Sequence, residues 1–460
     1  MRHRPSALYK EERGFRQGNQ VSCGHSVMTM QVPSPPIPVP LYAQVLVAVI
    51  GGATLGVVFG QEPYLYGLRN EQLGKLGLWV VWLLKTLAVP LIFFAIMDSL
   101  IRASLPLRQG AKLIAICLAN VSVAMLIGLT IMNLWQPGKS WQGHVEDLLN
   151  LIPGTTLTPA FTPSANPLED LFAYIPRTLT DPFGSNNIIG VVLLALGLGI
   201  VLRWARTLSG QAGGVLDYVA WAIEWIYGWL VRVLWWVILI VPFAVFGVVA
   251  NVVGKSGIGV FSTLWIFLVA MLLGLAVHAL LYYPLVAWII GKKSPKVYIG
   301  QGADAILTGL SCNSSLATVP ITLRCLERMQ VSSQSARLAA CVGTNLNNDG
   351  ITLYEAMAAL FLAHALGYDL PLSKQIVIVV ASIIAGAGVA GIPEAGMIVL
   401  PLVLSAAGLP DQVILASIPL IMTVDWIIAR ARSGVNVMSD MLVAILLDVG
   451  KTTPVTKSLA

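Results

Sequence analysis

Charged residues are scarce in this chain. They make up 11% of its 460 residues, whereas hydrophobic residues make up 57% and the mean hydropathy is +0.79. Soluble domains carry about 25% charged residues. The shortage of charge, together with apolar runs of about twenty residues, excludes a water-soluble globular protein and predicts an all-α polytopic membrane protein surrounded by the lipid bilayer. No polar stretch is long enough for a soluble domain of useful size.

Motifs of catalysis and of metal binding are also missing. The five cysteines show no CxxC spacing and the five histidines form no cluster, so we interpret the cysteines as small buried hydrophobic residues. The sequence has no nucleophile–base pairing and no nucleotide-binding loop, which argues against an enzyme and against an ATP-driven pump. The net charge of +6 requires no nucleic acid as a partner. We expect no cofactor.

The chain does contain a series of apolar segments. The leader, residues 1–39, is polar, lacks the hydrophobic region of a signal peptide and is expected to be disordered in the cytoplasm. The first six predicted spans are Leu41–Phe59, Leu78–Leu100, Leu113–Leu134, Ile188–Val201, Val233–Val253 and Phe261–Ile290. Basic residues gather in alternate loops, so the positive-inside rule predicts a multi-pass protein of the cell (plasma or inner) membrane with a cytoplasmic N-terminus.

After Lys296 the apolar segments are interrupted by polar or Gly-rich motifs. The motifs SCNSS, NLNNDG and GAGVAGIPEAG break the segments Asp304–Met329, Ala336–Leu366 and Ile376–Ala407, respectively. A broken hairpin followed by a helix with Asn and Asp thus occurs twice. Paired interruptions of this kind indicate the binding site of a transporter, because irregular backbone at membrane depth is tolerated only where it lines a cavity or is buried in protein.

The last long helix is predicted to bury charge, in the stretch DWIIARARSGVNVMSD. Asp425, Ala429, Arg432, Asn436 and Asp440 are spaced by threes and fours and share one helical face. Each charge costs roughly 2.5–3.5 kcal/mol at the bilayer centre, so it needs a ligand, an ion or a partner. Arg432 could pair with Asp425 or Asp440. Because isolated ion pairs are rare in membranes, we expect an unpaired guanidinium that holds a substrate carboxylate.

Oxygen-bearing side chains around the breaks suit hard cations such as sodium. Asn347 and Asp349 in the first copy, and Asn436 and Asp440 in the second, are predicted to bind such ions. The two asparagines could instead join helices by hydrogen bonds. Glu355 lies one turn beyond the NLNNDG break. It is either a proton carrier or a hydrogen-bond partner of a neighbouring helix.

Hydroxyls and backbone N–H groups at the two hairpin breaks suit an anionic group. Ser314 and Ser315 either bind substrate or satisfy helix carbonyls. The remaining residues of the predicted substrate site are Ser433, Ala429, Gly391, Ile392 and Pro393. Together with Arg432 these groups predict an anionic organic substrate with two carboxylates, held beside cations.

These motifs resemble the glutamate transporter family, the dicarboxylate/amino acid:cation symporters. The resemblance covers about residues 41–450 and rests on DAILTGLSCNSSLATVPITLRCLE, NNDGITLYEAMAALFLA, AGIPEAG and DWIIARARSGVNVMSD. It implies eight transmembrane helices plus two re-entrant helical hairpins, a homotrimer and an elevator mechanism. Residues 40–290 would then form mainly the scaffold, with the third and sixth helices joining the transport domain, whose core is 297–450.

The resemblance also implies roles for individual residues. Arg432 matches the arginine that binds the substrate's side-chain carboxylate, and Asn436 the asparagine near its backbone carboxylate and a sodium site. Asp440, Asn347 and Asp349 match sodium ligands. Glu355 matches a glutamate linked to proton coupling, and Ser314 and Ser315 fall in the serine run of the first hairpin.

Departures from the family pattern bear on the substrate. Ala429 stands where amino acid transporting members have an aspartate for the substrate's amino group, and dicarboxylate transporting members also lack that aspartate. We therefore hypothesise a secondary active symporter for C4-type dicarboxylates, driven by sodium and/or protons. The alternatives are an acidic amino acid symporter in which Glu394 receives the amino group, and a substrate-gated anion channel or sensor. Cys117, Asn120 and Val121 replace family tyrosine and hydroxyl residues at one sodium site, which leaves the number of ions open.

Overall fold

The computed structural model describes residues 39, 41–102, 107–142, 178–184, 188–209, 214–388, 391 and 394–450. Within these residues the secondary structure is helical, and the only strand-like pairing is an isolated bridge between Tyr64 and Leu68. In the same residues, 7 helices are long and apolar enough to cross a membrane. The prediction of an all-helical membrane protein is confirmed. The leader and most of the Gln136–Pro176 connection lie outside the described residues.

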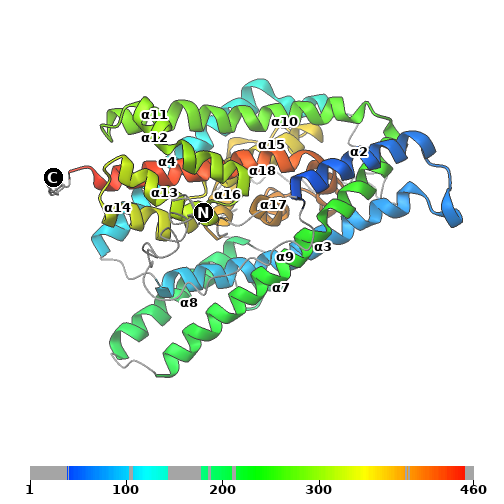
Figure 1. Cartoon of the computed structure of the whole chain (residues 1–460). Coiled ribbons are helices and arrows are strands. Elements are labelled where there is room, and N and C mark those ends of the chain that lie inside the picture. Colours follow the sequence, from blue (N-terminus) through cyan, green and yellow to red (C-terminus); the bar gives the residue numbers. More distant parts are fainter. Residues whose placement is uncertain are drawn as a thin grey trace, which may run out of the picture. The chain divides into compact units, whose positions relative to one another are not determined.

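Helices from the first half of the chain pack against one another. They are α2 (Leu41–Phe59), α3 (Asn70–Arg102), α8 (Ile188–Ser209) and α9 (Val215–Ser256). Figure 1 shows α3 alongside α9 and α8, and α2 also packs on α9. Small residues permit the close approach of α2 and α9, since a Cβ added at Gly52 would lie 2.5 Å from the Phe246 carbonyl oxygen. The helix α9 starts at Val215 rather than at the predicted Val233.

The third and sixth predicted spans both pack against the helix that follows the NLNNDG break. They correspond to α4 (Leu107–Trp135) and to α10 (Val260–Val277), which continues through a π-helical turn, η3 (His278–Tyr282), into α11 (Tyr283–Ile289). Both α4 and α10 contact α15 (Asp349–Ala365). π-Helical turns inside α-helices frequently mark functional sites.

The predicted interruptions are present in the described residues. The first hairpin consists of α12 (Pro295–Cys312) and α13 (Ser315–Arg328), and the second of α16 (Leu372–Gly388) and α17 (Ala395–Ala406). Asn313 and Glu394, at the two tips, have left-handed φ values of 51° and 58°. Such values are uncommon for residues other than glycine and turn the chain sharply between the two arms of a hairpin.

One long helix, α18 (Asp411–Asp448), runs among the other elements of the second half (Figure 1). It contacts α12, α13, α15 and α17, and it also reaches α3 and α9 of the first half. The shorter described elements are α7 (Asp181–Gly184), α14 (Ser333–Arg337), η1 (Leu65–Gly67), η2 (Pro137–Trp141), η4 (Leu338–Val342) and η5 (Gly343–Asn345).

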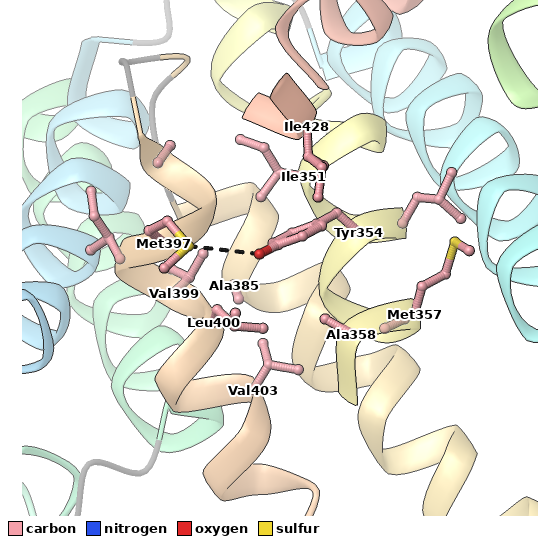
Figure 2. Packing of buried hydrophobic residues seen from close by; sticks show 14 of the residues in the cluster. Ile351, Tyr354, Met357, Ala358, Ala385, Met397, Val399, Leu400, Val403 and Ile428 are labelled. Atoms are coloured by element: carbon pink, nitrogen blue, oxygen red, sulfur yellow. Dashed lines mark hydrogen bonds between the residues drawn. The ribbon is translucent and has the colours of Figure 1, made fainter. Parts of the chain in front are cut away.

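The core beneath the hairpin tips is formed by α15, α16 and α17. Figure 2 shows Tyr354 pointing from α15 toward Met397 of α17, and its hydroxyl lies 3.7 Å from the sulfur. Leu400 and Val403 of α17 and Ala385 of α16 fill the space below this contact (Figure 2). The packing holds the start of α17 against α15, close to the buried face of α18.

Candidate functional site

The polar face of α18 is buried, and Arg432 on it has an acidic partner. Asp425 and Arg432 are 1% and 2% exposed. Each terminal nitrogen of the Arg432 guanidinium lies 3.0 Å from one carboxylate oxygen of Asp425. The prediction of an unpaired guanidinium is therefore wrong. A side chain seven residues away reaches Arg432, and the pairing spares both charges the cost of lying alone in a dry interior.

The guanidinium of Arg432 is also held on its faces. Its central carbon lies 4.1 Å from the ring centre of Tyr354, a cation–π contact. Gly396, in the first turn of α17, approaches from another side, and a Cβ at this position would lie 2.6 Å from the same carbon. Glycine therefore lets the second hairpin close directly onto Arg432. The second hairpin, α15 and α18 together fix one orientation of the cation.

Arg432 borders a cavity of about 240 Å³ between the hairpin tips and α18. Its lining is Asn313, Ser314, Ser315, Ile351, Gly391, Glu394, Ala395, Gly396, Ala429, Arg432, Ser433 and Asn436. The structure thus brings the predicted substrate residues together, except Ile392 and Pro393, which lie outside the described residues. The buried Ser433 hydroxyl has no hydrogen-bond partner within the described part of the chain.

The two hairpin tips contact each other at this cavity. The Ser314 hydroxyl donates to the Gly391 carbonyl at 2.6 Å, and the Leu316 N–H reaches the same carbonyl at 3.3 Å. The amide of Asn313 donates to Oε1 of Glu394 at 2.9 Å. Ser314 also caps α13, because its side chain accepts a hydrogen bond from the Ala317 N–H. Its hydroxyl therefore satisfies backbone groups, which is one of the two roles considered for it from the sequence.

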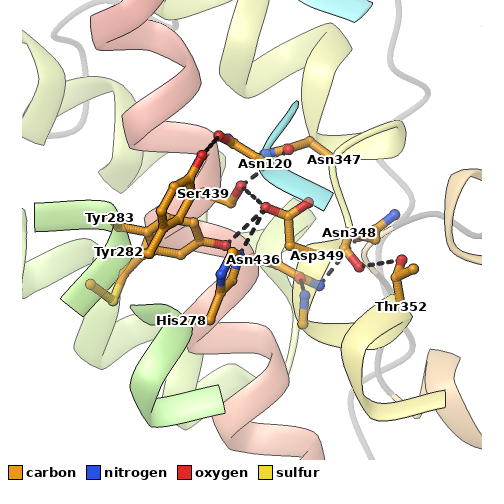
Figure 3. A network of polar contacts seen from close by, with 12 residues as sticks. Asn120, His278, Tyr282, Tyr283, Asn347, Asn348, Asp349, Thr352, Asn436 and Ser439 are labelled. Carbon is orange, nitrogen blue, oxygen red and sulfur yellow. Dashed lines mark hydrogen bonds and ion pairs between the residues drawn. The ribbon is translucent and has the colours of Figure 1, made fainter. Parts of the chain in front are cut away.

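The residues predicted to bind cations form one network beside the cavity (Figure 3). The amide of Asn347 donates to Asp440 at 3.1 Å. The Ser439 hydroxyl lies 2.7 Å from Oδ2 of Asp349 and 3.1 Å from the Asn347 side-chain oxygen, so it bridges the two copies of the motif. Oxygen atoms of carboxylate, amide and hydroxyl groups converge here. This donor chemistry fits a hard cation such as sodium.

Asn436 belongs to both the cavity and the network. Its side-chain oxygen accepts a hydrogen bond from the Gly350 N–H at 2.8 Å, and its amide donates to Asn348 at 3.2 Å. The same residue lines the cavity beside Arg432. The contacts show that Asn436 joins α18 to α15, as the alternative interpretation of the asparagines proposed. They also place it at the border between the network and the cavity.

Asp349 has further partners that sequence reasoning missed. The Tyr283 hydroxyl donates to Oδ2 of Asp349 at 3.0 Å, and Nε2 of His278 lies 3.5 Å from this oxygen (Figure 3). The Tyr282 hydroxyl donates to Asn120 of α4 at 2.9 Å. His278, Tyr282 and Tyr283 lie in and just after the π-helical turn. The available signal was a group of polar rings within an apolar span, where polar groups generally serve a site.

Glu355 is fully buried on α15, at 0% exposure. Neither of its carboxyl oxygens has a hydrogen-bond partner among the described residues. The hydrogen bond to a neighbouring helix that the sequence allowed is therefore not observed in that part of the chain. A buried carboxyl group without a partner is costly in its charged form. This environment suits the predicted proton carrier, a role that stays a prediction.

The fold and the site together define a helical membrane transporter, with a small cavity lined by both hairpin tips beside an oxygen-rich network. The model of the sodium:dicarboxylate symporter family matches residues 41–449, and the chain belongs to this family. The predicted family membership is thereby confirmed, and the family is one of transporters rather than enzymes.

Similar proteins include several excitatory amino acid transporters. Excitatory amino acid transporter 1 of Ambystoma tigrinum is 26% identical over 453 residues, which cover 88% of this chain and 81% of that protein. Excitatory amino acid transporter 3 of Homo sapiens is 26% identical over 440 residues, with 85% and 82% covered. Excitatory amino acid transporter 1 of Mus musculus is 32% identical over 263 residues, with 57% and 47% covered.

Proposed function

We propose that the chain is a secondary active symporter that moves an acidic amino acid together with sodium. The observation that carries this proposal is the guanidinium of Arg432, held by Asp425 and Tyr354 at a small cavity that the two hairpin tips close. A cation fixed in this way matches a carboxylate. The names of the similar proteins favour an acidic amino acid over the C4 dicarboxylate of our first hypothesis.

Coupling in this proposal depends on the contact between network and cavity. Sodium ions binding among Asp349, Asn347 and Asp440 would place positive charge next to the cavity and lower the cost of holding an anion there. Asn436 would connect ion binding to substrate binding, because it lines the cavity and its side-chain oxygen accepts a hydrogen bond from Gly350 at the start of α15. Glu355 would carry a proton in the same cycle.

The proposed movement is that of an elevator. Residues 297–450 form the core of the transport domain, and 40–290 mainly the scaffold of a homotrimer in the cell membrane, with the N-terminus in the cytoplasm. The contacts of α4 and α10 with α15 support the assignment of the third and sixth helices to the moving domain. The two broken hairpins would be re-entrant, in addition to eight transmembrane helices. The closed contact between their tips would open to admit the solute.

A C4 dicarboxylate remains the second candidate substrate, because Ala429 brings a methyl group to the cavity where an anion would bind an ammonium. Uptake into proteoliposomes of labelled aspartate, glutamate and succinate, with and without a sodium gradient, tests both candidates. We expect sodium-driven accumulation of an acidic amino acid. Accumulation of succinate alone would support the dicarboxylate, and a substrate-gated current without accumulation would support the channel or sensor.

A further inference from the structure

We propose that Glu394 at the tip of the second hairpin is the anion that binds the substrate's ammonium group. The site would then select dicarboxylic acids that carry an amino group, although Ala429 provides no charge. This inference rests on the proposed function and names the substrate class of the same cavity. The amino group would then be bound by the second hairpin, through Glu394, rather than by α18.

The first step of the argument concerns the carboxylates near the cavity. Glu394 is the only acidic residue among the described residues that line it. Asp425 lies nearby, but both of its oxygens are engaged with the guanidinium of Arg432. An ammonium group in this cavity therefore has one carboxylate available to it, which is that of Glu394.

The second step concerns the charge that Glu394 retains. Its hydrogen-bond donor is the amide of Asn313, which is neutral, and the nearby charged groups are Arg432, Arg430 and Asp425. Arg430 also lies on α18, but its guanidinium donates to the Trp426 carbonyl oxygen and lies over the ring of Tyr42, 4.6 Å from its centre. Arg430 and Glu394 also line a neighbouring pocket together with Asp425. The one hydrogen bond to the Glu394 carboxylate in the described part of the chain comes from a neutral amide, so a cation in the cavity can still approach this carboxylate.

The third step concerns the pattern of charge that the solute meets. Arg432, although paired with Asp425, presents guanidinium N–H groups to the cavity, and Glu394 presents a carboxylate to the same cavity. A molecule with carboxylates and an ammonium group complements both signs. A dicarboxylate without an amino group has no positive group to pair with Glu394 and places a negative charge near it. Binding of such a dicarboxylate is therefore disfavoured.

The fourth step links selection to closure. Asn313 belongs to the first hairpin and Glu394 to the second, so their hydrogen bond joins the two tips over the cavity. Asn313 thus links the Glu394 carboxylate to the first hairpin. The carboxylate that recognises the ammonium group is thus also part of the contact between the two hairpin tips. A solute without an ammonium group makes no ion pair with this carboxylate and would be bound more weakly.

The variant E394Q tests the inference in uptake assays with the full chain in proteoliposomes. Glutamine keeps the length of the side chain and an oxygen that accepts from Asn313, but it removes the charge. We expect the KM for aspartate to rise roughly 10- to 100-fold, the range that follows from losing one hydrogen bond to a charged group. The KM for succinate should stay unchanged or fall. Adding A429D to E394Q should restore aspartate uptake, because it returns an anion to the cavity.

The control variant N313A removes the contact between the tips and keeps the charge. It should raise the KM for aspartate without increasing the preference for succinate. If E394Q does not fold, E394D serves as a second variant, because aspartate keeps the negative charge. E394D should retain the preference for aspartate over succinate, and loss of this preference would overturn the inference. An E394Q protein with the wild-type KM for aspartate would also overturn it and leave the proposed function standing. A wild-type protein that accumulates no acidic amino acid would overturn both.

Discussion

At the scale of single residues, the pair of Arg432 and Asp425 is best understood as a means of orientation. A buried ion pair often contributes little net stability, because desolvation of both charges offsets their attraction. The pair nevertheless fixes the guanidinium by two parallel hydrogen bonds at 3.0 Å, while Tyr354 covers one face. A cation held in this way needs no rearrangement before a carboxylate arrives. Burying the two charges thus costs folding stability but gives substrate binding a preorganised cationic group.

Removing one member of this pair should cost more than removing both. In R432M or D425L the remaining charge is buried without a partner, which destabilises by roughly 3–5 kcal/mol. The double variant R432M/D425L should recover most of this loss and yet fail to bind substrate. Thermal unfolding of the purified variants, with and without aspartate, measures both effects. A double variant that is less stable than both single variants would show that the pair itself holds the fold together.

Glu355 gives a second prediction at this scale. Since its carboxyl group has no hydrogen-bond partner in the described residues, E355Q should change the melting temperature little. If the residue carries the transported proton, uptake by E355Q should no longer depend on pH, while sodium dependence remains. Uptake measured over an acidic to neutral pH series decides this. A pH profile identical to that of the wild type would remove Glu355 from the coupling mechanism.

At the scale of helices, the site depends on the junction between α11, α15 and α18. Asp349 begins α15, Tyr283 begins α11, and Ser439 lies on α18 beside Asp440. Hydroxyls from both neighbouring helices therefore converge on one buried carboxylate. A hydroxyl can donate to a carboxylate or turn a lone pair toward a cation. The junction is suited to both the ion-free and the ion-bound state.

Replacing Tyr283 by phenylalanine should alter the sodium dependence of transport. The substitution leaves the ring and removes one donor to Asp349, at an expected cost in stability of about 1–3 kcal/mol. Sodium titration of uptake should show a changed half-saturating concentration. Y298F is the matched control, because Tyr298 is equally buried but donates to the Met438 carbonyl oxygen. Equal sodium dependence in Y283F and the wild type would count against a role for the junction in ion binding.

At the scale of the whole molecule, few polar contacts join the first-half helices to α18. Lys85 of α3 forms an ion pair with Asp411 at 2.8 Å, and Asp411 is 68% exposed. Arg430 of α18 lies over Tyr42 of α2. Surface ion pairs contribute only about 0–1 kcal/mol, so the pair of Lys85 and Asp411 breaks readily. Such a boundary suits two parts that slide past each other.

A cross-link across this boundary should stop transport and spare binding. In a background without native cysteines, we expect K85C/D411C joined by a short bifunctional thiol reagent to lose uptake but to keep stabilisation by substrate. The matched control is D304C/R328C, which replaces an ion pair within the first hairpin. Its cross-link should leave uptake largely intact. Full uptake by cross-linked K85C/D411C would contradict the elevator.

Much of the fold was accessible from the sequence because it depends on local patterns. Apolar runs gave the spans, and polar or Gly-rich interruptions placed the breaks of both hairpins and of the segment before α15. The spacing from Asp425 to Asp440 correctly indicated a buried polar face on one long helix. Span ends were less accurate. The helix α9 extends far before Val233, because its tryptophans and isolated charges do not interrupt a helix although they lower the hydropathy.

Periodicity thus settled which side chains share a face, since a helix repeats regularly and each position follows from its neighbours. It did not settle which partner each polar group takes. The spacing allowed Arg432 to remain free or to pair with either of two aspartates, and only the packing around Tyr354 and Gly396 selected Asp425. Ser314 and Gly391, 77 residues apart, and Tyr283 and Asp349, 66 apart, meet because separate helices pack together. Such contacts depend on the closeness of distant segments, which no local pattern records.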